Sequence, residues 1–436
     1  MDICQVLKKL EKRNLFITGG GGVGKSWMIG QLKEELPLVL TSSTGISAIN
    51  IEGQTIHSWA GIGIADKPIE QVVSFITKSS KGKNKFKEIC STNYLVIDEI
   101  SMLNSYTLDY INEVLKQVRG INKAFGGIRV LLVGDFFQLP PVKIGEMVEI
   151  NGASRLMDYC FNSKAWKELN LETIYLKKVW RQTDKNFIET LNNIRIGKIT
   201  KKDKELLQSR NYPSSFKPPK EAVKLYAVNE QVDAENKRRF DAVKEKEYTF
   251  EAVDKIRSWI DSSIQYVSPN NSKLPSWDKA KYEAFDRDCR VPKILKLKKG
   301  ARVMLLKNIS FDYGLVNGSC GYITKLNQHS IEVTFDNGEI FAVEKDKLEL
   351  KDGKTAKITR EQYPLRLAYS QSIHKAQGAT FDSVYIDCSR FFECGQAYVA
   401  LSRARTLDKM YLTNFDADKI YVDNKVTEFY EQLQTN

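Results

Sequence analysis

The sequence predicts an α/β protein with a parallel sheet covered on both faces, and three observations lead to that prediction. Short apolar runs alternate with helical patterns over the first 140 residues. A glycine-rich loop directly follows the first apolar run, at Gly19–Gly24. A pair of acidic residues directly follows a later run, at Asp98-Glu99. Strands of parallel sheets are buried on both faces and read as continuous apolar runs, as these do.

The first strand and its loop match a phosphate-binding pattern. Leu15–Ile17 leads into G-x-x-x-x-G-K-S at 19–26, and a helical segment follows. Glycines let successive backbone N–H groups face an anion, and the helix N-terminus adds partial positive charge. Lys25 is placed to reach the β- and γ-phosphates, and the Ser26 hydroxyl to bind Mg²⁺. We therefore expect the chain to bind a nucleoside triphosphate.

Three more apolar runs extend this sheet: Leu38–Leu40, Tyr94–Ile97 and Ile128–Val133. Residues 62–90 between them are polar, basic at their end, and predicted to form an exposed excursion from the sheet.

Polar residues follow two of these strands. Asp98 is predicted to hold Mg²⁺, and Glu99 to orient and deprotonate the attacking water, which favours hydrolysis over phosphate transfer. Gln138 follows the strand that ends near Val133, where its side chain would contact the γ-phosphate. Seen alone, such groups are often solvated turn residues, but the phosphate loop upstream makes the catalytic interpretation the stronger one.

A second α/β unit is predicted from later apolar runs. Its expected strands are Ile174–Val179, Val223–Val228, Leu365–Tyr369, Val384–Ile386 and Met410–Leu412. Between them, 295–350 reads as a meander or small barrel with turns at Asn317-Gly318 and Asn337-Gly338. If the two units face each other across the nucleotide, Arg181 and Arg403 would act as arginine fingers.

Composition narrows the class of protein. The chain has 436 residues, enough for two or three domains, and a net charge of +12 that suits a polyanionic partner. Its seven cysteines form no C-x-x-C pair, and no apolar stretch is long enough to cross a membrane. We expect a soluble intracellular protein, cytoplasmic if bacterial or viral and otherwise nuclear or mitochondrial.

Seven motifs stand in this order along the chain: GGGGVGKS, TSSTGISAINIEGQTIHSWAGIG, VIDEISM, FGGIRVLLVGDFFQLPPV, WRQTD, QSIHKAQGAT and YVALSRART. Together they resemble the motifs of the petite-integration-frequency (Pif-one) family of superfamily 1B DNA helicases. The segment LKQVRGINKAFGG (115–127) is similar to that family's own signature, and LKKGARVMLLKN with GLVNGSCGYI resembles its inserted barrel. The resemblance runs from about Gln5 to about Leu412.

The resemblance implies two RecA-like P-loop NTPase domains with a small inserted SH3-like β-barrel. The first domain would span 1–170, with 62–90 as a possible wedge, and the second 171–245 and 360–436. The barrel would span 295–355, leaving 246–294 as an unplaced connection. No accessory domains of the kind that larger relatives carry are expected.

The resemblance also implies an ATP-dependent, Mg²⁺-requiring motor that moves 5′→3′ on single-stranded DNA. Such a motor unwinds duplexes, junctions, forks and G-quadruplexes, and we expect it to act as a monomer. Matched positions place ATP on Gln5, Gly22, Gly24, Lys25, Ser26, Asp98, Glu99, Gln138, Arg181, Gly378 and Arg403. They place DNA on Thr44, His57, His374 and Lys375, where hydroxyls and cations suit phosphates and flat rings suit bases.

Three alternatives remain open at this point. A RecD-type recombination helicase shares the core motifs, although the Phe-Gly-Gly signature and GDFFQLPPV favour the family named above. A protein-remodelling P-loop NTPase would need neither TIHSWAGIG nor the basic excess. A non-enzymatic nucleic-acid-binding module would not need the complete set of catalytic residues.

Overall fold

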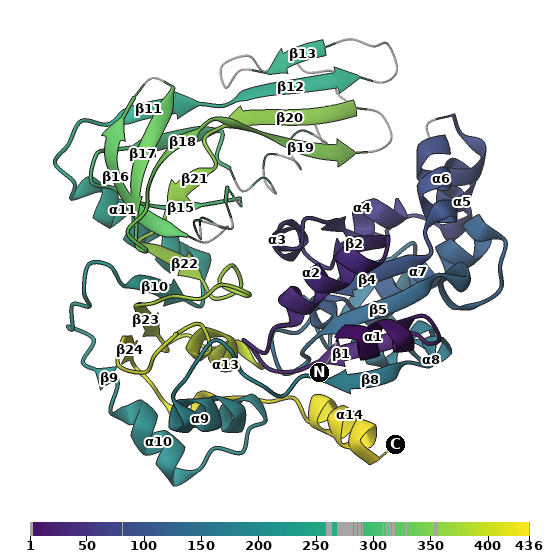
Figure 1. The fold of residues 1–436 in the computed structure, drawn as a ribbon, viewed down its shortest axis with the longest axis horizontal. Coiled ribbons are helices and arrows are strands. Elements are labelled where there is room, and N and C mark those ends of the chain that lie inside the picture. The colour runs from purple at the N-terminus through teal and green to yellow at the C-terminus, as the bar shows by residue number, and fades with distance from the viewer. Residues whose placement is uncertain are drawn as a thin grey trace. The chain divides into compact units, whose positions relative to one another are not determined.

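The computed structural model describes residues 3–80, 82–258, 264–267, 282, 286, 289, 291–307, 309, 310, 313, 315, 319–327, 329–352 and 356–435. These fall into two compact units (Figure 1). The first comprises Met1–Val228 and Ser372–Asn436, and the second comprises Asn229–Gln371. Each unit is described separately below.

The first unit contains a six-stranded sheet in the order β3-β2-β4-β5-β1-β8, in which every neighbouring pair is parallel. The four strands expected from apolar runs are confirmed as β1, β2, β4 and β5. The bounds are β1 (Leu15–Thr18), β2 (Leu38–Ser42), β3 (Gln54–Thr55), β4 (Tyr94–Asp98), β5 (Arg129–Gly134) and β8 (Glu172–Tyr175).

Strand β8 corrects one expectation. From the sequence, the run Ile174–Val179 was expected in the sheet that contains Val223–Val228. Its first residues instead lie in β8, which pairs in parallel with β1 in the six-stranded sheet. Ile17 lies opposite Ile174 in that register, and both are buried. An apolar run predicts a buried strand but carries no information about which sheet the strand joins, because that depends on distant parts of the chain.

Helices cover both faces of this sheet. On one face α1 (Ile3–Leu10) and α2 (Lys25–Glu35) pack through Val6, Leu10, Met28 and Leu32. The opposite face packs against α7 (Ser105–Arg119), α8 (Lys164–Leu169) and the C-terminal α14 (Asn424–Thr435). The doubly covered parallel sheet is therefore confirmed. Shorter helical elements complete this part: α3 (Gly45–Asn50), α4 (Ile56–Ala60), η1 (Ile100–Met102), η2 (Ala124–Gly127) and η3 (Cys160–Asn162).

The excursion at 62–90 is helical. Its two helices, α5 (Ile69–Lys78) and α6 (Lys83–Ser91), bury Val72, Ile76 and Ile89 in the core that contains α7. Their period-3.6 apolar face explains why a segment rich in lysine is only partly exposed. Arg119 at the end of α7 donates to the carbonyls of Ile89 (2.7 Å) and Gly126 (2.7 Å), so it ties α6 to the signature segment.

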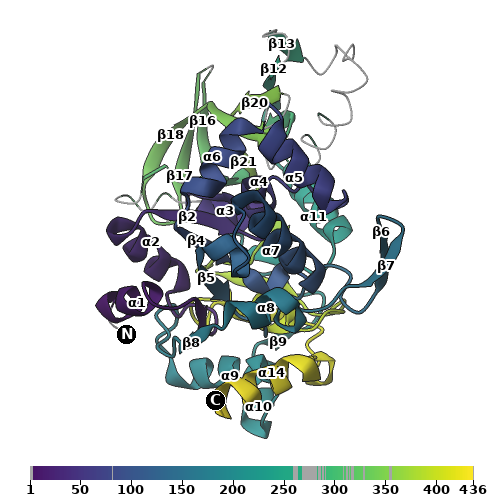
Figure 2. The same ribbon diagram turned by 90° about the vertical axis from the view of Figure 1, so that its right-hand side faces the viewer.

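The first unit also holds a second parallel sheet with the neighbours β10-β23-β24-β9. Its strands are β10 (Val223–Tyr226), β23 (Val384–Asp387), β24 (Met410–Thr413) and β9 (Asn211–Tyr212), and β22 (Ser370–Ser372) lies at the boundary of the two units. Three of the expected strands, in β10, β23 and β24, are thus confirmed. The helical elements that accompany this sheet are α9 (Lys185–Arg195), α10 (Lys201–Gln208), α13 (Gln396–Leu401) and η4 (Ala417–Lys419). A hairpin, β6 (Met147–Ile150)–β7 (Ala153–Leu156), follows β5 of the six-stranded sheet. Figure 2 shows this hairpin at the edge of the first unit.

Among its described residues, the second unit contains antiparallel strands and α11 (Asn229–Asp241). A five-stranded sheet has the order β18-β17-β16-β15-β21, a four-stranded sheet has the order β13-β12-β20-β19, and β11 pairs with β14. The bounds are β11 (Tyr248–Glu251), β12 (Val253–Ser258), β13 (Ile264–Val267), β14 (Ile294–Leu297), β15 (Arg302–Leu305), β16 (Cys320–Leu326), β17 (Ser330–Phe335), β18 (Ile340–Glu344), β19 (Asp346–Asp352), β20 (Ala356–Gln362) and β21 (Leu365–Leu367).

The observed strands test the turns and the strand assignment that the sequence predicted for this region. The turn at Asn337-Gly338 is confirmed, because it joins β17 to β18 with Gly338 at φ 92°. Asn317-Gly318 lies outside the described residues. The placement of Leu365–Tyr369 in the second α/β sheet is wrong for β21, which pairs antiparallel with β15. The SH3-like character of the insertion and the domain boundaries stay predictions.

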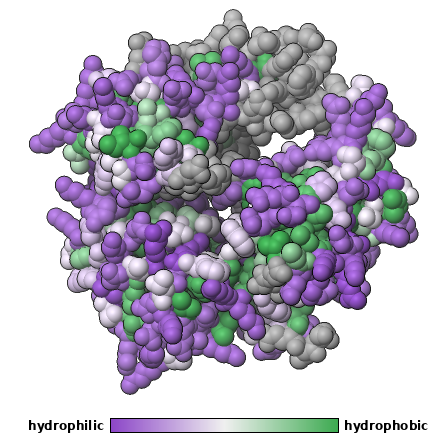
Figure 3. All heavy atoms as spheres, viewed as in Figure 1, coloured by the Kyte–Doolittle hydropathy of each residue, from purple (hydrophilic) through white to green (hydrophobic). Residues whose placement is uncertain are grey.

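Hydrophilic residues cover most of the face shown in Figure 3, with hydrophobic residues in smaller patches. Within the described ranges, no helix has the length and apolar character needed to cross a membrane.

Candidate nucleotide site

The phosphate loop begins where β1 ends. Leu15, Phe16 and Ile17 are buried, so the strand is fixed and the loop leaves from a rigid edge. Gly22 (φ 79°) and Gly24 (φ 89°) adopt the left-handed conformation, which side chains disfavour. Lys25 opens α2, and its Nζ donates to the carbonyls of Gly19 (2.7 Å) and Gly20 (2.9 Å). The ammonium thus lies over the loop, and burial lowers its pKa. Ser26, at the exposed start of α2, follows it directly.

The two predicted carboxylates lie at the carboxyl end of β4. Asp98 is buried and accepts a 2.9 Å hydrogen bond from the Glu99 backbone N–H. Burial, together with the adjacent Glu99 charge, raises the pKa of Asp98 to about 7. Burial also raises the pKa of Glu99. Glu99 itself has φ 50°, a conformation that costs a non-glycine residue energy and is enriched at functional sites.

Two arginines predicted as fingers lie together against the phosphate loop. A Cβ built on Gly21 would lie 3.2 Å from Arg403 Nη2 and 3.4 Å from Arg181 Nη1. Both guanidiniums bind Ser402: Arg181 Nη1 donates to its carbonyl (3.0 Å) and Arg403 Nη2 to its hydroxyl (2.7 Å). Burial and the neighbouring Arg181 lower the pKa of Arg403 to about 9. One buried and one half-buried guanidinium beside an anion-binding loop create a place where a polyanion is favoured.

The other residues predicted to bind the nucleotide are Gln138, Gly378 and Gln5, and they do not all lie near the phosphate loop or the arginines. Gln138 is buried after β5, with its Nε2 3.4 Å from Asp135 Oδ2. The Gly378 carbonyl accepts from Arg181 Nη2 at 3.3 Å, which places this glycine beside the arginines. Gln5 lies on the exposed side of α1, and the contacts described for α1 do not bring it to the loop.

The four predicted DNA residues come from both sheets of the first unit. The Thr44 hydroxyl caps α3, because it accepts from Ser47 N–H (3.2 Å). His57 lies in α4, where burial lowers its pKa and favours the neutral ring. His374 Nε2 lies 2.8 Å from Glu393 Oε2, so its ring has a carboxylate partner. Lys375 follows it, and its backbone N–H contacts the Ser372 hydroxyl (3.4 Å).

Five residues of the site were not singled out from the sequence. Gln377 donates to Glu99 Oε2 (3.0 Å), and the Tyr398 hydroxyl accepts from Gly21 N–H (2.6 Å). Asp135 forms an ion pair with Arg195, and both lie beside the loop with Tyr430. Gln377 and Asp135 stand inside motifs, HKAQGAT and GDFFQLPP, which was the available signal. Arg195 and Tyr430 carry no local signal in the sequence.

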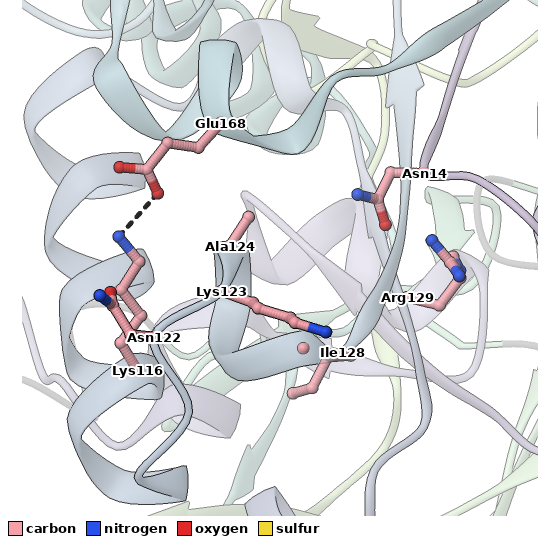
Figure 4. Close-up of a pocket in the computed structure, with 9 residues that line it drawn as sticks. Asn14, Lys116, Asn122, Lys123, Ala124, Ile128, Arg129 and Glu168 are labelled. Atoms are coloured by element: carbon pink, nitrogen blue, oxygen red, sulfur yellow. Dashed lines mark ion pairs between the residues drawn. The ribbon is translucent and has the colours of Figure 1, made fainter.

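Two cavities of the first unit differ in their relation to this site. One, of about 450 Å³, borders the phosphate loop at Gly19 and Gly20 and is lined also by Phe137, Arg195 and Tyr430. Another, of about 630 Å³, lies where β1 and β5 begin, at the amino ends of the strands and so at the end of the sheet away from the phosphate loop (Figure 4). In Figure 4 the ion pair between Lys116 and Glu168 (2.7 Å) lies on one side of it and Arg129 on the other. Its lining includes none of the predicted nucleotide residues.

The geometry defines a P-loop NTPase site, with a phosphate loop, two strand-end carboxylates and two arginines from elsewhere in the chain. Comparison with known proteins then gives the family. A family model for PIF1-like helicase matches residues 2–205, and one for the 2B domain of DNA helicase Pif1 matches 282–326. The chain belongs to the PIF1-like helicase family, and the resemblance stated above is confirmed.

Individual relatives agree. The chain is 35% identical to the ATP-dependent DNA helicase PIF1 of Xenopus laevis over 432 residues and to that of Homo sapiens over 431, covering 98% of this chain in each case. It spans 62% of the length of those two relatives. Among solved structures, the Pif1 helicase of Candida albicans matches with a TM-score of 0.78 and 32% identity, covering 99% of this chain and 97% of that one. Pif1 from Bacteroides in complex with ADP-AlF4 matches with a TM-score of 0.76 and 29% identity, covering 99% and 96%.

Proposed function

We propose that this chain is an ATP-dependent DNA helicase that translocates 5′→3′ on single-stranded DNA. It would act at junctions and forks, unwinding duplexes and G-quadruplexes as a monomeric motor. The observation that carries the proposal is the meeting of Arg181 and Arg403 at Gly21 of the phosphate loop, in a member of this family. Solved relatives from Bacteroides include Pif1 bound to single-stranded DNA, and another relative is described as unwinding forked DNA through two coordinating Pif1 helicases.

In the proposed ATPase cycle, the loop amides of Gly22 and Gly24 hold the phosphates. Lys25 exchanges its two carbonyl partners for β- and γ-phosphate oxygens. Glu99 orients the attacking water and accepts its proton, a role that a carboxylate with a raised pKa performs well near neutral pH. Gln138 contacts the γ-phosphate, and Gln5 reads the adenine.

Charge develops on the γ-phosphate oxygens as the bond to the leaving group breaks. Arg403 is buried, Arg181 is half-buried, and both are already oriented beside the loop, so they would stabilise that charge without reorganising. Gly378 places its carbonyl on Arg181 and so helps to hold that guanidinium.

The donor set also fits Mg²⁺. Ser26 supplies a hydroxyl and Asp98 a carboxylate, the hard oxygen ligands that this ion prefers alongside phosphates and water. The buried Asp98 carboxylate has its Oδ1 bonded to one backbone N–H, and a cation would favour its ionised form. When bound, the ion would neutralise phosphate charge.

On the DNA side, Thr44 and Lys375 would contact phosphates, while His57 and His374 would offer rings to the bases. Alternation of ATP-bound and ATP-free states would change which of the two parallel sheets of the first unit, with its loops, holds the single-stranded DNA.

The test is the rate of ATP hydrolysis with and without single-stranded DNA, followed by unwinding of forks with a 5′ or a 3′ loading tail. We expect strong stimulation and unwinding from the 5′ tail alone, with Lys25→Ala as the inactive control. Unwinding only from the 3′ tail would refute the polarity, and absence of stimulation would refute the DNA motor.

A further inference from the structure

A buried ion pair links Asp135, which follows β5, to Arg195 at the end of α9. Arg195 Nε donates to Asp135 Oδ2 (2.9 Å) and its Nη2 to Oδ1 (2.7 Å). Asp135 is fully buried, and the Arg195 side chain is 16% exposed. This two-point geometry is the strongest that an arginine forms with a carboxylate. Burial alone would raise the pKa of the Asp135 carboxyl, but Arg195, together with Lys25 and the Phe137 N–H, lowers it.

The pair lies directly beside the phosphate loop. A Cβ on Gly20 would lie 3.5 Å from Arg195 Cδ and 3.8 Å from its Nε. The Lys25 ammonium lies at the same place, because its Nζ donates to the Gly19 and Gly20 carbonyls, and Arg195 holds Asp135 there. The Asp135 charge attracts Lys25, so it competes with an incoming phosphate for Lys25 and opposes the phosphate itself.

Other contacts prevent Asp135 from turning away. The Phe137 N–H (3.3 Å) and the Tyr430 hydroxyl (3.4 Å) both approach Asp135 Oδ1. The Tyr430 hydroxyl also lies 2.6 Å from Thr18 Oγ1, on the residue before the phosphate loop. The Tyr430 ring stacks on Phe137 (4.7 Å between centroids), and the Arg195 guanidinium lies 4.7 Å from the Phe137 ring centre.

We propose that Arg195 is a positioning residue for ATP, which cancels the charge of Asp135 beside the phosphate loop and leaves Lys25 available to the phosphates. Tyr430 assists Arg195, because its hydroxyl contacts both Asp135 and Thr18 and fixes the position of the carboxylate relative to the start of the phosphate loop. This proposal rests on the proposed ATPase function, which supplies the anion that must be accepted.

The decisive experiment is rescue of ATP affinity, measured with a fluorescent ATP analogue. Arg195→Gln leaves a buried, uncompensated carboxylate, so the dissociation constant should rise about tenfold or more. Asp135→Asn should weaken affinity less than Arg195→Gln does, because it removes the opposing charge. The double variant should recover to the level of Asp135→Asn, since the repulsion is then gone. Double-variant affinity as weak as that of Arg195→Gln would overturn the proposal.

Conservative variants keep the test decisive if Arg195→Gln does not fold. Arg195→Lys retains the charge but loses the two-point geometry, so affinity should fall less, and Asp135→Asn should again restore it. Absence of rescue in that pair would equally refute the charge-cancelling role.

Tyr430→Phe tests the second part, with Tyr159→Phe as its matched control. Tyr159 is another buried tyrosine of the same core, and its hydroxyl donates to Asp423 (3.0 Å) instead of to the loop residues. Tyr430→Phe should weaken ATP binding about threefold or more, the loss of roughly one hydrogen bond, while Tyr159→Phe should leave it unchanged. Equal affinity in both variants would refute the role of Tyr430. If the wild-type chain bound no ATP, the proposed function would fail instead.

Discussion

Gln377 and Glu99, 278 positions apart in the chain, are joined by a hydrogen bond of 3.0 Å from the amide Nε2 to the carboxylate Oε2. Glu99 follows a strand of the six-stranded sheet, and Gln377 precedes the glycine whose carbonyl binds Arg181. The proposed base is therefore held by the same segment that holds a proposed arginine finger. Because donation from Gln377 favours the ionised carboxylate, it lowers the pKa of Glu99 against the effect of burial.

Replacing this glutamine should move the pH dependence of hydrolysis. In Gln377→Leu the pKa of Glu99 rises further, so the carboxylate is protonated at higher pH and cannot act as a base. The pH below which kcat falls should therefore be higher than in the wild type, and kcat at pH 7 should be reduced about threefold to tenfold. The measurement is kcat between pH 6 and 9 with saturating DNA. An unchanged pH dependence would show that the hydrogen bond does not tune the base.

Glu99→Gln should separate binding from chemistry. The amide keeps the shape of the side chain but cannot accept a proton, so hydrolysis should fall by about a hundredfold or more. Affinity for ATP and for single-stranded DNA should change little. Titration of both ligands, beside single-turnover product formation, checks this. A collapse of ATP affinity would mean that Glu99 binds the nucleotide and does not serve as the base.

Asp98→Asn should stabilise the nucleotide-free protein, and the gain should depend on pH. The folded pKa of about 7 lies above the ordinary value of 3.8, so between these values the unfolded chain releases a proton that the folded chain retains. The resulting loss in the free energy of unfolding is absent below about pH 4 and reaches its full size above about pH 7. The melting temperature of the variant should exceed that of wild type at pH 8 by at least about 2 °C, the shift that roughly 1 kcal/mol produces.

The difference should disappear towards pH 4. Thermal melts of both proteins across this range provide the measurement, with Asp98→Glu as a variant that retains the charge. A wild type more stable than Asp98→Asn at pH 8 would contradict the raised pKa.

DNA binding should weaken steeply with salt. Contacts between cations and phosphates release counterions, at about 0.7 per phosphate on single strands. Three or more contacts would give a slope of about −2 or steeper for the logarithm of the binding constant against that of salt. Lys375→Gln should make the slope shallower by up to about 0.7. Binding that does not vary between low and physiological salt would rule out phosphate contacts as its main source.

The sequence allowed the nucleotide site to be predicted better than the assembly around it. The loop at 19–26 and the pair Asp98-Glu99 are continuous stretches with a fixed relation to their strands, so local pattern suffices to place them. β8 and β21 were assigned to the wrong sheet because an apolar run is compatible with any buried parallel or antiparallel neighbour.

Arg195 shows the remaining limit. In the sequence it is one arginine near the end of an amphipathic helix, where a favourable interaction with the helix C-terminus would be explanation enough. Its partner Asp135 lies 60 positions earlier, and only the folded chain brings the two together. Tyr430 likewise reads as a core residue of a C-terminal helix, and nothing near it indicates that it reaches Thr18.

The position of α14 has a consequence for how the protein is made. Phe429 stacks on Phe161 (4.2 Å between centroids), and the Tyr430 hydroxyl accepts from the Phe136 N–H (3.2 Å) across 294 positions of sequence. On a ribosome that adds about 5–20 residues per second, Phe136 therefore waits roughly 15–60 seconds for this partner. During that interval the aromatic face behind the phosphate loop stays uncovered and open to aggregation. The six-stranded sheet, although encoded first, has this face covered only when α14 has been synthesised.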